Sequence, residues 1–412
     1  MNKLIIVVVA LSVASAARAQ EAQQDPQGQE QPAPDVAALE GRLAALEEQL
    51  AEAKGSLLSL SRLKFSGYVQ ARWAYQECIG NRQPNCSYDA YYESPSSAPS
   101  SGPSQTGFHL RRARFKGVYD AGVAQLVLQL DASPSAVTAK EAYASVKLPK
   151  LGGLGGLAID AGLQLLPFGY DVGVRSSSDL DLLERFRGAR TWLAGEYDLG
   201  VTLRGAYGPF NLRAGVFNGN GVEGGKNWDN DQHKDVVGRL GFDFGLVTGG
   251  VSGWYGETTD YRANPDVTRD RRRLGADAQI FLDLLPFGGT ALKGEFIVGT
   301  TTLASGSGAG GDLGVTGHAW HATVTQNLGR MFVLAARYES YVRDNNLVAA
   351  ARTVKELRAL DVALHLFVGG NYKLTALWTH PMNGETVGSG PGDPAGTVEE
   401  TDVYTIQAQA RF

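Results

Sequence analysis

The stretch YTIQAQARF, residues 404–412, decides the fold class because its side chains alternate between two kinds. Its apolar members are Tyr404, Ile406, Ala408 and Ala410. The residues between them are polar, and this period of two predicts a β-strand with two unlike faces. An edge strand would fray at an apolar last residue such as Phe412. We therefore expect neighbours to hold this strand on both sides in a closed sheet, which has no edge to protect.

The same alternation recurs through residues 63–412, in about sixteen segments. In LKFSGYVQARWAYQ, which begins at Leu63, one face is apolar over 14 residues, whereas soluble strands are usually shorter. Short links such as DAG and NLGR alternate with long ones such as 77–106 and 380–401. This pattern predicts an all-β transmembrane fold, an up-and-down antiparallel barrel whose inner face meets water. The alternative is a large soluble lectin-like or propeller fold, which would need apolar residues facing inward.

The residues before the barrel divide into three parts. Residues 1–19 hold Lys3, an apolar run and the small residues Ala17 and Ala19, which is typical of a secretory signal peptide. Residues 20–34 have no aromatic residue and no aliphatic residue larger than alanine, so we expect a flexible linker. No later stretch reaches 18 uninterrupted apolar residues, and we expect no transmembrane helix.

Residues 35–61 follow a heptad pattern, with apolar side chains at alternating steps of three and four. The positions that define the apolar seam are Val36, Leu39, Leu43, Leu46, Leu50 and Leu57. So narrow a seam favours self-association, and we expect a periplasmic coiled coil. The alternative is a solitary helix that lies on a larger domain.

Charge and cysteine content narrow the possible partners. Removing Lys3 and Arg18 with the signal peptide leaves 36 of the 38 basic residues against 43 acidic ones, a net charge of −7. Nucleic acid is therefore not an expected partner. Cys78 and Cys86 lie in a polar segment of an exported chain, which predicts one disulfide that closes a small loop. A metal pair at these cysteines would need further nearby ligands, which the sequence does not offer.

The sequence gives no sign of an enzyme or of a cofactor. Its six histidines are spread along the chain without a partnered serine motif. The segment NWDNDQHKD, with Asp229, Asp231 and Asp235, could hold a divalent cation, but a solvated acidic loop is the preferred interpretation. We therefore expect no catalytic site, no cofactor and no metal site.

Three motifs and the aromatic terminus resemble the phosphate-selective porin O and P family of Gram-negative outer membranes. The motifs are FHLRRARFKG from Phe108, LQLLPFGYDVGVRSSSDLDLLERF from Leu163 and GVFNGNG from Gly215. The resemblance covers residues 63–412. It implies a homotrimer of sixteen-stranded barrels in the outer membrane, each passing small anions such as phosphate, with the third long loop folded into the pore.

Basic residues on the inward register are the candidates for anion selectivity. Those expected to line the pore are Arg112, Arg114 and Lys116 on the second strand, and Arg175, Arg185, Arg187 and Arg190 in the third long loop. Further inward cations are Arg204, Arg213, Arg239, Arg273, Lys293, Arg337 and Lys373. Carboxylates such as Asp131, Glu141 and Asp277 share that face. The apolar side chains within residues 166–190 need cover from water, so we expect this loop to form the constriction.

Two functions follow from these features. The first is a channel for passive diffusion of small hydrophilic solutes across the outer membrane, with a preference for anions. The second is an interaction protein whose coiled coil tethers the lipid bilayer of the outer membrane to peptidoglycan, with conduction secondary.

Overall fold

The computed structural model describes residues 44–50, 61–76, 105–134, 136–193, 196–219, 221, 232–260, 267–301, 315–342, 356–382 and 402–412. The chain forms two units, residues 1–61 and 62–412. In the first unit, residues 44–50 are helical, and Leu46 and Leu50 are exposed there. The remaining seam residues of the predicted coiled coil lie outside the described residues, as do the signal peptide and the linker. Cys78 and Cys86 lie outside them too, so the coiled coil and the disulfide stay predictions.

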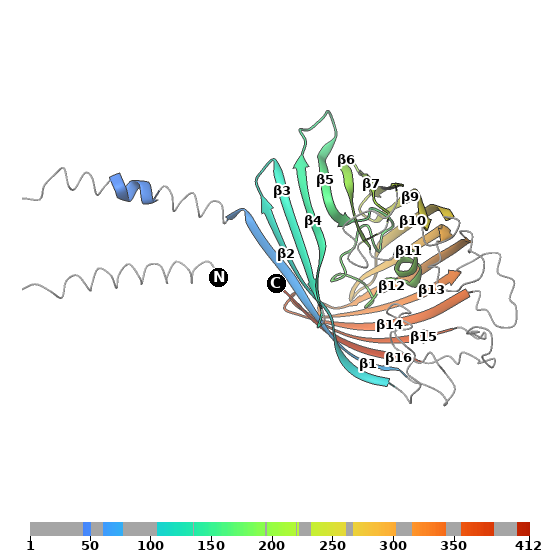
Figure 1. Cartoon of the computed structure of the whole chain (residues 1–412). Coiled ribbons are helices and arrows are strands. Elements are labelled where there is room, and N and C mark those ends of the chain that lie inside the picture. The colour runs from blue at the N-terminus through green and yellow to red at the C-terminus, as the bar shows by residue number, and fades with distance from the viewer. Residues whose placement is uncertain are drawn as a thin grey trace, which may run out of the picture. The chain divides into compact units, whose positions relative to one another are not determined.

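The second unit is a closed barrel of sixteen antiparallel strands (Figure 1). Each strand pairs with its neighbours in the chain, and the first pairs with the last, so the predicted strand number and topology are confirmed. The strands are β1 Leu63–Gln76, β2 Gln105–Asp120, β3 Ala124–Ala132, β4 Val137–Lys147, β5 Gly155–Leu165, β6 Tyr197–Tyr207, β7 Phe210–Phe217, β8 Asp235–Asp243, β9 Val247–Asp260, β10 Val267–Leu285, β11 Gly288–Thr301, β12 Val315–Leu328, β13 Phe332–Val342, β14 Glu356–Val368, β15 Tyr372–Pro381 and β16 Val403–Arg411.

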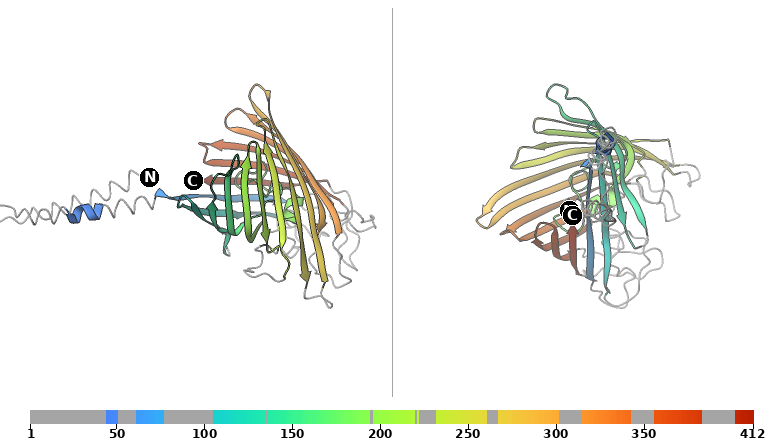
Figure 2. Two further views of the ribbon diagram at one scale, coloured as in Figure 1. Left: turned by 90° about the horizontal axis from the view of Figure 1, so that it is seen from above. Right: turned by 90° about the vertical axis from the view of Figure 1, so that its left-hand side faces the viewer.

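The seam between β1 and β16 closes the barrel (Figure 2). Its register runs from Tyr68 opposite Arg411 to Gln76 opposite Val403. Beyond it, the backbones of Gly67 and Phe412 exchange two hydrogen bonds of 3.2 and 3.1 Å. A Cβ atom at Gly67 would lie 2.5 Å from the carbonyl oxygen of Arg114 and 2.8 Å from the Phe412 ring, so only glycine fits there. The terminal strand is therefore paired on both sides, as its alternation predicted.

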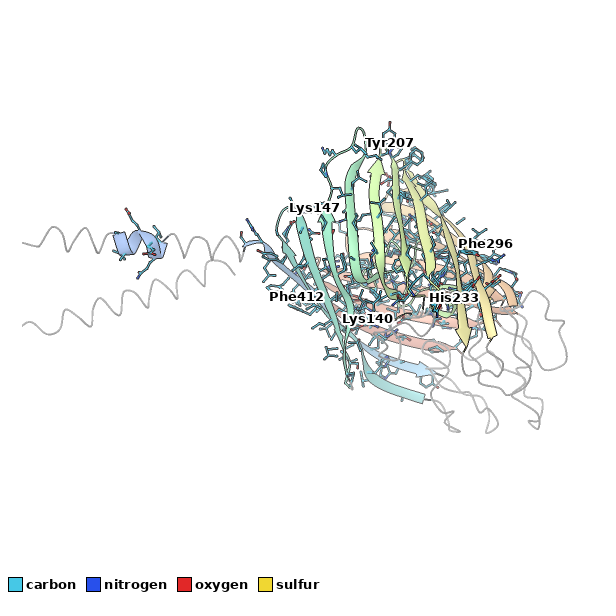
Figure 3. All side chains as sticks on the ribbon, turned by 45° about the horizontal axis from the view of Figure 1, so that its top comes forward. Lys140, Lys147, Tyr207, His233, Phe296 and Phe412 are labelled. Carbon is cyan, nitrogen blue, oxygen red and sulfur yellow. The ribbon has the colours of Figure 1, made fainter. Side chains whose placement is uncertain are left out.

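The two faces of the sheet differ as the alternation predicts. On β1, Phe65 and Val69 are exposed on the outer face, whereas Gln70 and Arg72 are buried on the inner one. Phe296 is one of many apolar side chains on the outer surface (Figure 3). Such an apolar exterior is what transmembrane barrels present to lipid. No helix among the described residues is long and apolar enough to cross a bilayer.

Short turns join the strands at one end of the barrel, and most of the longer connections lie at the other end. The turns between β6 and β7, β10 and β11, and β14 and β15 each contain two or three residues. In the last of these, Gly369 and Gly370 have φ values of 61° and 75°, which favour glycine. The connection between β3 and β4, residues 133–136, is the short exception at the long-loop end.

Candidate functional site in the barrel interior

The loop between β5 and β6, residues 166–196, folds into the barrel, and we name it L3 (Figure 1). Arg72 Nη2 on β1 donates to the carbonyl oxygen of Leu183 across 3.0 Å. Arg337 Nη1 on β13 donates to the carbonyl oxygen of Glu184 across 2.9 Å. His365 Nε2 on β14 lies 2.6 Å from the carbonyl oxygen of Asp181. These inward side chains bind L3 inside the barrel, so the predicted inward fold of residues 166–190 is confirmed.

An apolar patch of the inner wall anchors L3. The buried cluster combines Leu166, Phe168, Val172, Phe186, Ala189, Trp192 and Leu193 of L3 with Phe217, Val237, Trp254, Ile297, Ala319 and Tyr341 of the strands. Within L3 the short helix α4, Arg187–Trp192, packs against β12 and β13. Burying these side chains removes apolar surface from water. The alternation of the strands predicted an inner face that meets water, so this apolar patch was not predicted from the sequence.

Glu184 of L3 accepts hydrogen bonds from three arginines of the barrel wall. Its Oε1 atom lies 2.7 Å from Arg72 Nη2 and 2.7 Å from Arg111 Nε, and its Oε2 atom lies 2.9 Å from Arg112 Nη2. Burial alone would raise the pKa of this carboxyl, but the three guanidinium groups outweigh it. They hold the pKa of Glu184 well below its usual range, so the group is a carboxylate at neutral pH.

A bulge in β2 explains why two consecutive arginines reach Glu184. Gln70 pairs with Arg112, but Ala71 pairs with Leu110, so Arg111 is the extra residue. Such a residue departs from strict alternation and re-aims its side chain. Alternation alone predicts that Arg112 faces inward and does not predict the inward contact of Arg111.

The other two predicted cations of β2 also face carboxylates. Arg114 Nε donates to Asp131 Oδ2 across 2.9 Å, and its guanidinium lies over the Tyr197 ring at 5.9 Å from the ring centroid. Lys116 pairs with Glu141 on β4. The predicted inward direction of Arg112, Arg114 and Lys116 agrees with the structure, but each of these charges is matched by an acid.

Of the four predicted arginines of L3, Arg175, Arg185 and Arg190 bond to other atoms of the loop, and Arg187 contacts the barrel wall through its backbone. Arg175 pairs with Asp181, and Arg185 pairs with Glu196 across 2.5 Å. Arg190 Nε donates to the carbonyl oxygen of Arg185 across 2.9 Å, and the backbone N–H of Arg187 donates to Glu339 of β13.

Three inward arginines of adjacent strands lie side by side on the inner wall, and we call them the arginine row. Arg204 on β6 pairs in register with Arg213 on β7, which pairs with Arg239 on β8. The outer two have acids: Arg204 Nε lies 3.0 Å from Asp160, and Arg239 Nη2 lies 2.6 Å from Asp277. The sequence predicts that all three face inward, but their adjacency depends on strand register.

Arg213, in the middle of the row, differs from its neighbours. Its Nη2 atom donates to Gln164 Oε1 across 2.9 Å, and it makes no ion pair within the part of the chain that the structure describes. Its Nε–H has no hydrogen-bond partner there either. The row therefore offers guanidinium donors that the protein does not fully use.

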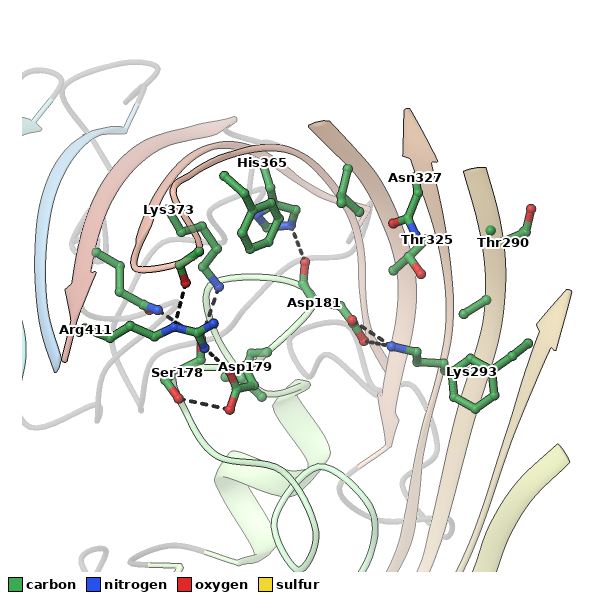
Figure 4. A pocket seen from close by; sticks show the side chains of 18 of the residues that line it. Ser178, Asp179, Asp181, Thr290, Lys293, Thr325, Asn327, His365, Lys373 and Arg411 are labelled. Atoms are coloured by element: carbon green, nitrogen blue, oxygen red, sulfur yellow. Dashed lines mark hydrogen bonds and ion pairs between the residues drawn. The ribbon is translucent and has the colours of Figure 1, made fainter. Parts of the chain in front are cut away.

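A cavity of about 530 Å³, lined by both charged and apolar side chains, lies next to L3 at the short-turn end of the barrel (Figure 4). Lys293 and Asp181 form an ion pair of 2.8 Å on its wall, and Arg411 lies 3.3 Å from Asp179. Lys373 Nζ donates to the carbonyl oxygen of Ser178 across 3.3 Å. Charges from L3 and from the strands thus line a water-accessible space in the lumen.

Comparisons with solved structures find outer-membrane porins. The chain is similar to an anion-selective porin from Comamonas acidovorans (14% identity, TM-score 0.56, covering 85% of this chain and 99% of that one). It is also similar to the outer-membrane channel DcaP of Acinetobacter baumannii (10% identity, TM-score 0.57, covering 85% and 97%) and to OprB of Pseudomonas putida (10%, 0.57, covering 88% and 97%). At these identities the likeness establishes the fold.

Family models and curated proteins give no match. The resemblance to the phosphate-selective porin O and P family therefore stays a prediction.

Proposed function

We propose that this protein is an outer-membrane channel through which small hydrophilic solutes diffuse passively, with a preference for anions. The observation that carries the proposal is the contrast between an apolar outer face and an inner face that carries many charged side chains and encloses a cavity, in one closed barrel. A lipid bilayer is the medium that such an exterior fits. The similarity to solved porins supports the same conclusion. We assign no catalytic step to the barrel.

The arginine row supports the anion preference. The side chain of Arg204 is 38% exposed, and Arg213 has no carboxylate partner among the described residues. Guanidinium groups are strong donors to oxyanions and can bind them through two hydrogen bonds at once. We propose that phosphate is among the anions that pass and that the arginine row attracts them. Arg112, Arg114, Lys116, Arg175 and Arg185 would mainly hold L3 and the wall in shape, because carboxylates match their charges.

Planar-bilayer recordings on the purified full chain test the proposal. We expect discrete, lasting conductance steps with no need for an energy source. In a salt gradient the zero-current potential should have the sign of an anion-selective pore, and replacing chloride by phosphate should leave a measurable current. A barrel that inserts without conducting would refute the channel, whereas cation selectivity would refute only the anion preference.

Assembly into a homotrimer and a periplasmic coiled coil over residues 35–61 belong to the same proposal. The helical conformation of residues 44–50 agrees with the heptad pattern. The competing function, tethering to peptidoglycan, predicts cosedimentation of the full chain with cell-wall sacculi. Loss of that cosedimentation on removal of residues 35–61 would favour tethering. The bilayer recordings separate the two functions, because a tether need not conduct.

A further inference from the structure

Three buried side chains converge where L3 meets the barrel wall: Asp171 of L3, Glu295 of β11 and His321 of β12. One oxygen or nitrogen atom from each lies within 4.8 Å of the other two. Their residues are 5%, 3% and 5% exposed, respectively. We propose that this cluster binds a divalent transition-metal ion of the zinc class, which joins L3 to the wall.

Two of the atoms that would bind the metal have no hydrogen-bond partner within the described part of the chain. Glu295 Oε1 and His321 Nε2 are buried, and neither makes a hydrogen bond. Buried polar atoms are nearly always satisfied, and leaving one without a partner costs about 1–3 kcal/mol. A metal ion would satisfy both atoms at once.

The local backbone leaves room for the carboxylate of Glu295. Gly169 has a φ of 68°, and a Cβ atom there would lie 2.1 Å from Glu295 Oε1. Any other residue at position 169 would displace this oxygen. The glycine therefore leaves the space that the unpartnered oxygen occupies.

The remaining polar atoms are already held in place, as is usual around a metal site. Glu295 Oε2 accepts the backbone N–H groups of Tyr170 and Asp171 across 3.1 and 2.9 Å. His321 Nδ1 lies 3.1 Å from Thr323 Oγ1, which leaves Nε2 as the ring nitrogen for a ligand. The backbone N–H of Phe186 donates to Asp171 Oδ2 across 3.3 Å. Such contacts orient the ligands.

The donor set selects the class of ion. One imidazole nitrogen and two carboxylates suit Zn²⁺ and its neighbours among the transition metals. Calcium would require six to eight oxygen ligands, and magnesium prefers oxygen and water. A divalent ion would also balance two buried carboxylates. Its role would be structural, since the site cross-links L3 to β11 and β12.

Metal analysis of the full chain, purified in detergent, tests this inference with Zn²⁺ itself as the probe. The protein is equilibrated with zinc, dialysed and analysed by elemental mass spectrometry, and its thermal unfolding is followed with zinc or with EDTA. The variants are Glu295→Gln and His321→Gln. The matched control is His380→Gln. His380 lies on β15, away from the cluster, and its Nδ1 atom lies 2.7 Å from Asp402 Oδ1.

We expect one zinc ion per chain in the wild type and in His380→Gln, with a thermal midpoint that zinc raises and EDTA lowers. Zinc affinity should fall by at least about tenfold in His321→Gln and Glu295→Gln. Absence of bound zinc in the wild type, or equal binding by wild type and both cluster variants, would overturn the inference. If a variant fails to fold, the visible absorption spectrum of the wild type loaded with Co²⁺ provides the test instead. Bands typical of nitrogen and oxygen ligation, displaced by zinc, support the site, and their absence refutes it.

Discussion

The guanidinium group of Arg112 on β2 donates to Glu184 of L3 across 2.9 Å, so a carboxylate of L3 neutralises the charge of this inward arginine. Arg72 and Arg111 share the same carboxylate. Glu184 thus neutralises charge on β1 and β2, so these arginines hold L3 in place and the proposed selectivity rests on other cations of the inner wall.

Selectivity should depend on Arg213 more than on the paired arginines. Replacing Arg213 by Glu removes an inward cation that has no acid partner among the described residues, so the zero-current potential should shift toward cations. The shift should be larger at 0.1 M salt, where the Debye length is about 10 Å, than at 1 M, where it is about 3 Å. The control is Arg272→Glu, the same charge change at an exposed side chain paired with Asp270. Equal shifts in the two variants would contradict the assignment.

Loss of the Glu184 charge should destabilise the protein. Gln at this position leaves three arginines of like charge without their common anion, and breaking a buried ion pair costs about 3–5 kcal/mol. Thermal unfolding in detergent should show a lower midpoint for Glu184→Gln. The control Glu257→Gln removes a half-buried carboxylate that pairs only with His233 among the described residues, and its midpoint should hardly change. Equal midpoints for the wild type and Glu184→Gln would show that the ion pairs of Glu184 contribute no stability.

The stabilisation from Glu184 should persist in mild acid. Because the folded pKa lies well below the usual value of about 4.3, the stabilisation is present above that value and is lost only as pH falls through the lower folded pKa. The difference in thermal midpoint between wild type and Glu184→Gln should therefore stay constant from pH 7 to about 5. A difference that already vanishes at pH 5 would mean that the pKa is not depressed.

Shortening L3 should widen the proposed pore through the barrel. Deleting residues 176–184 removes the segment that contacts β1, β13 and β14, so single-channel conductance should rise. The milder variant Asp181→Asn weakens only the ion pairs with Arg175 and Lys293 and should give a smaller rise or more current noise. An unchanged conductance in the deletion variant would place the constriction elsewhere.

The heptads should join subunits rather than support the barrel. Replacing Leu43 and Leu50 by Asp puts charge into the apolar seam, which a coiled coil does not tolerate. Crosslinked oligomers should become less abundant, while the barrel keeps its heat-modifiable mobility on gels. Equally abundant and heat-stable oligomers in this variant would show that the coil does not hold the assembly.

Period-two alternation was sufficient to predict the barrel because lipid and water impose opposite demands on the two faces. The inward position of L3 was also predictable, because Leu180 and Phe186 require apolar cover that the outside does not offer. Contacts that depend on register or on tertiary folding were not predictable. The bulge at Arg111 breaks alternation, and the arginine row exists only once β6, β7 and β8 are aligned. Asp171 and Glu295, which the sequence analysis did not connect, are 124 residues apart.

The pairing of β1 with β16 also sets the order in which the sheet can assemble. Every other pair of neighbouring strands is consecutive in the chain, so it can form as a local hairpin, whereas this one joins Tyr68 to Arg411. Until the intervening strands are in place, both strands have bare edges that could pair with another copy of the chain. These edges are covered only when β1 and β16 pair, so closure of the barrel is also the step that ends this exposure. In pulse-labelled hydrogen exchange, the amide of Gly67, which donates to Phe412, should be among the last to gain protection.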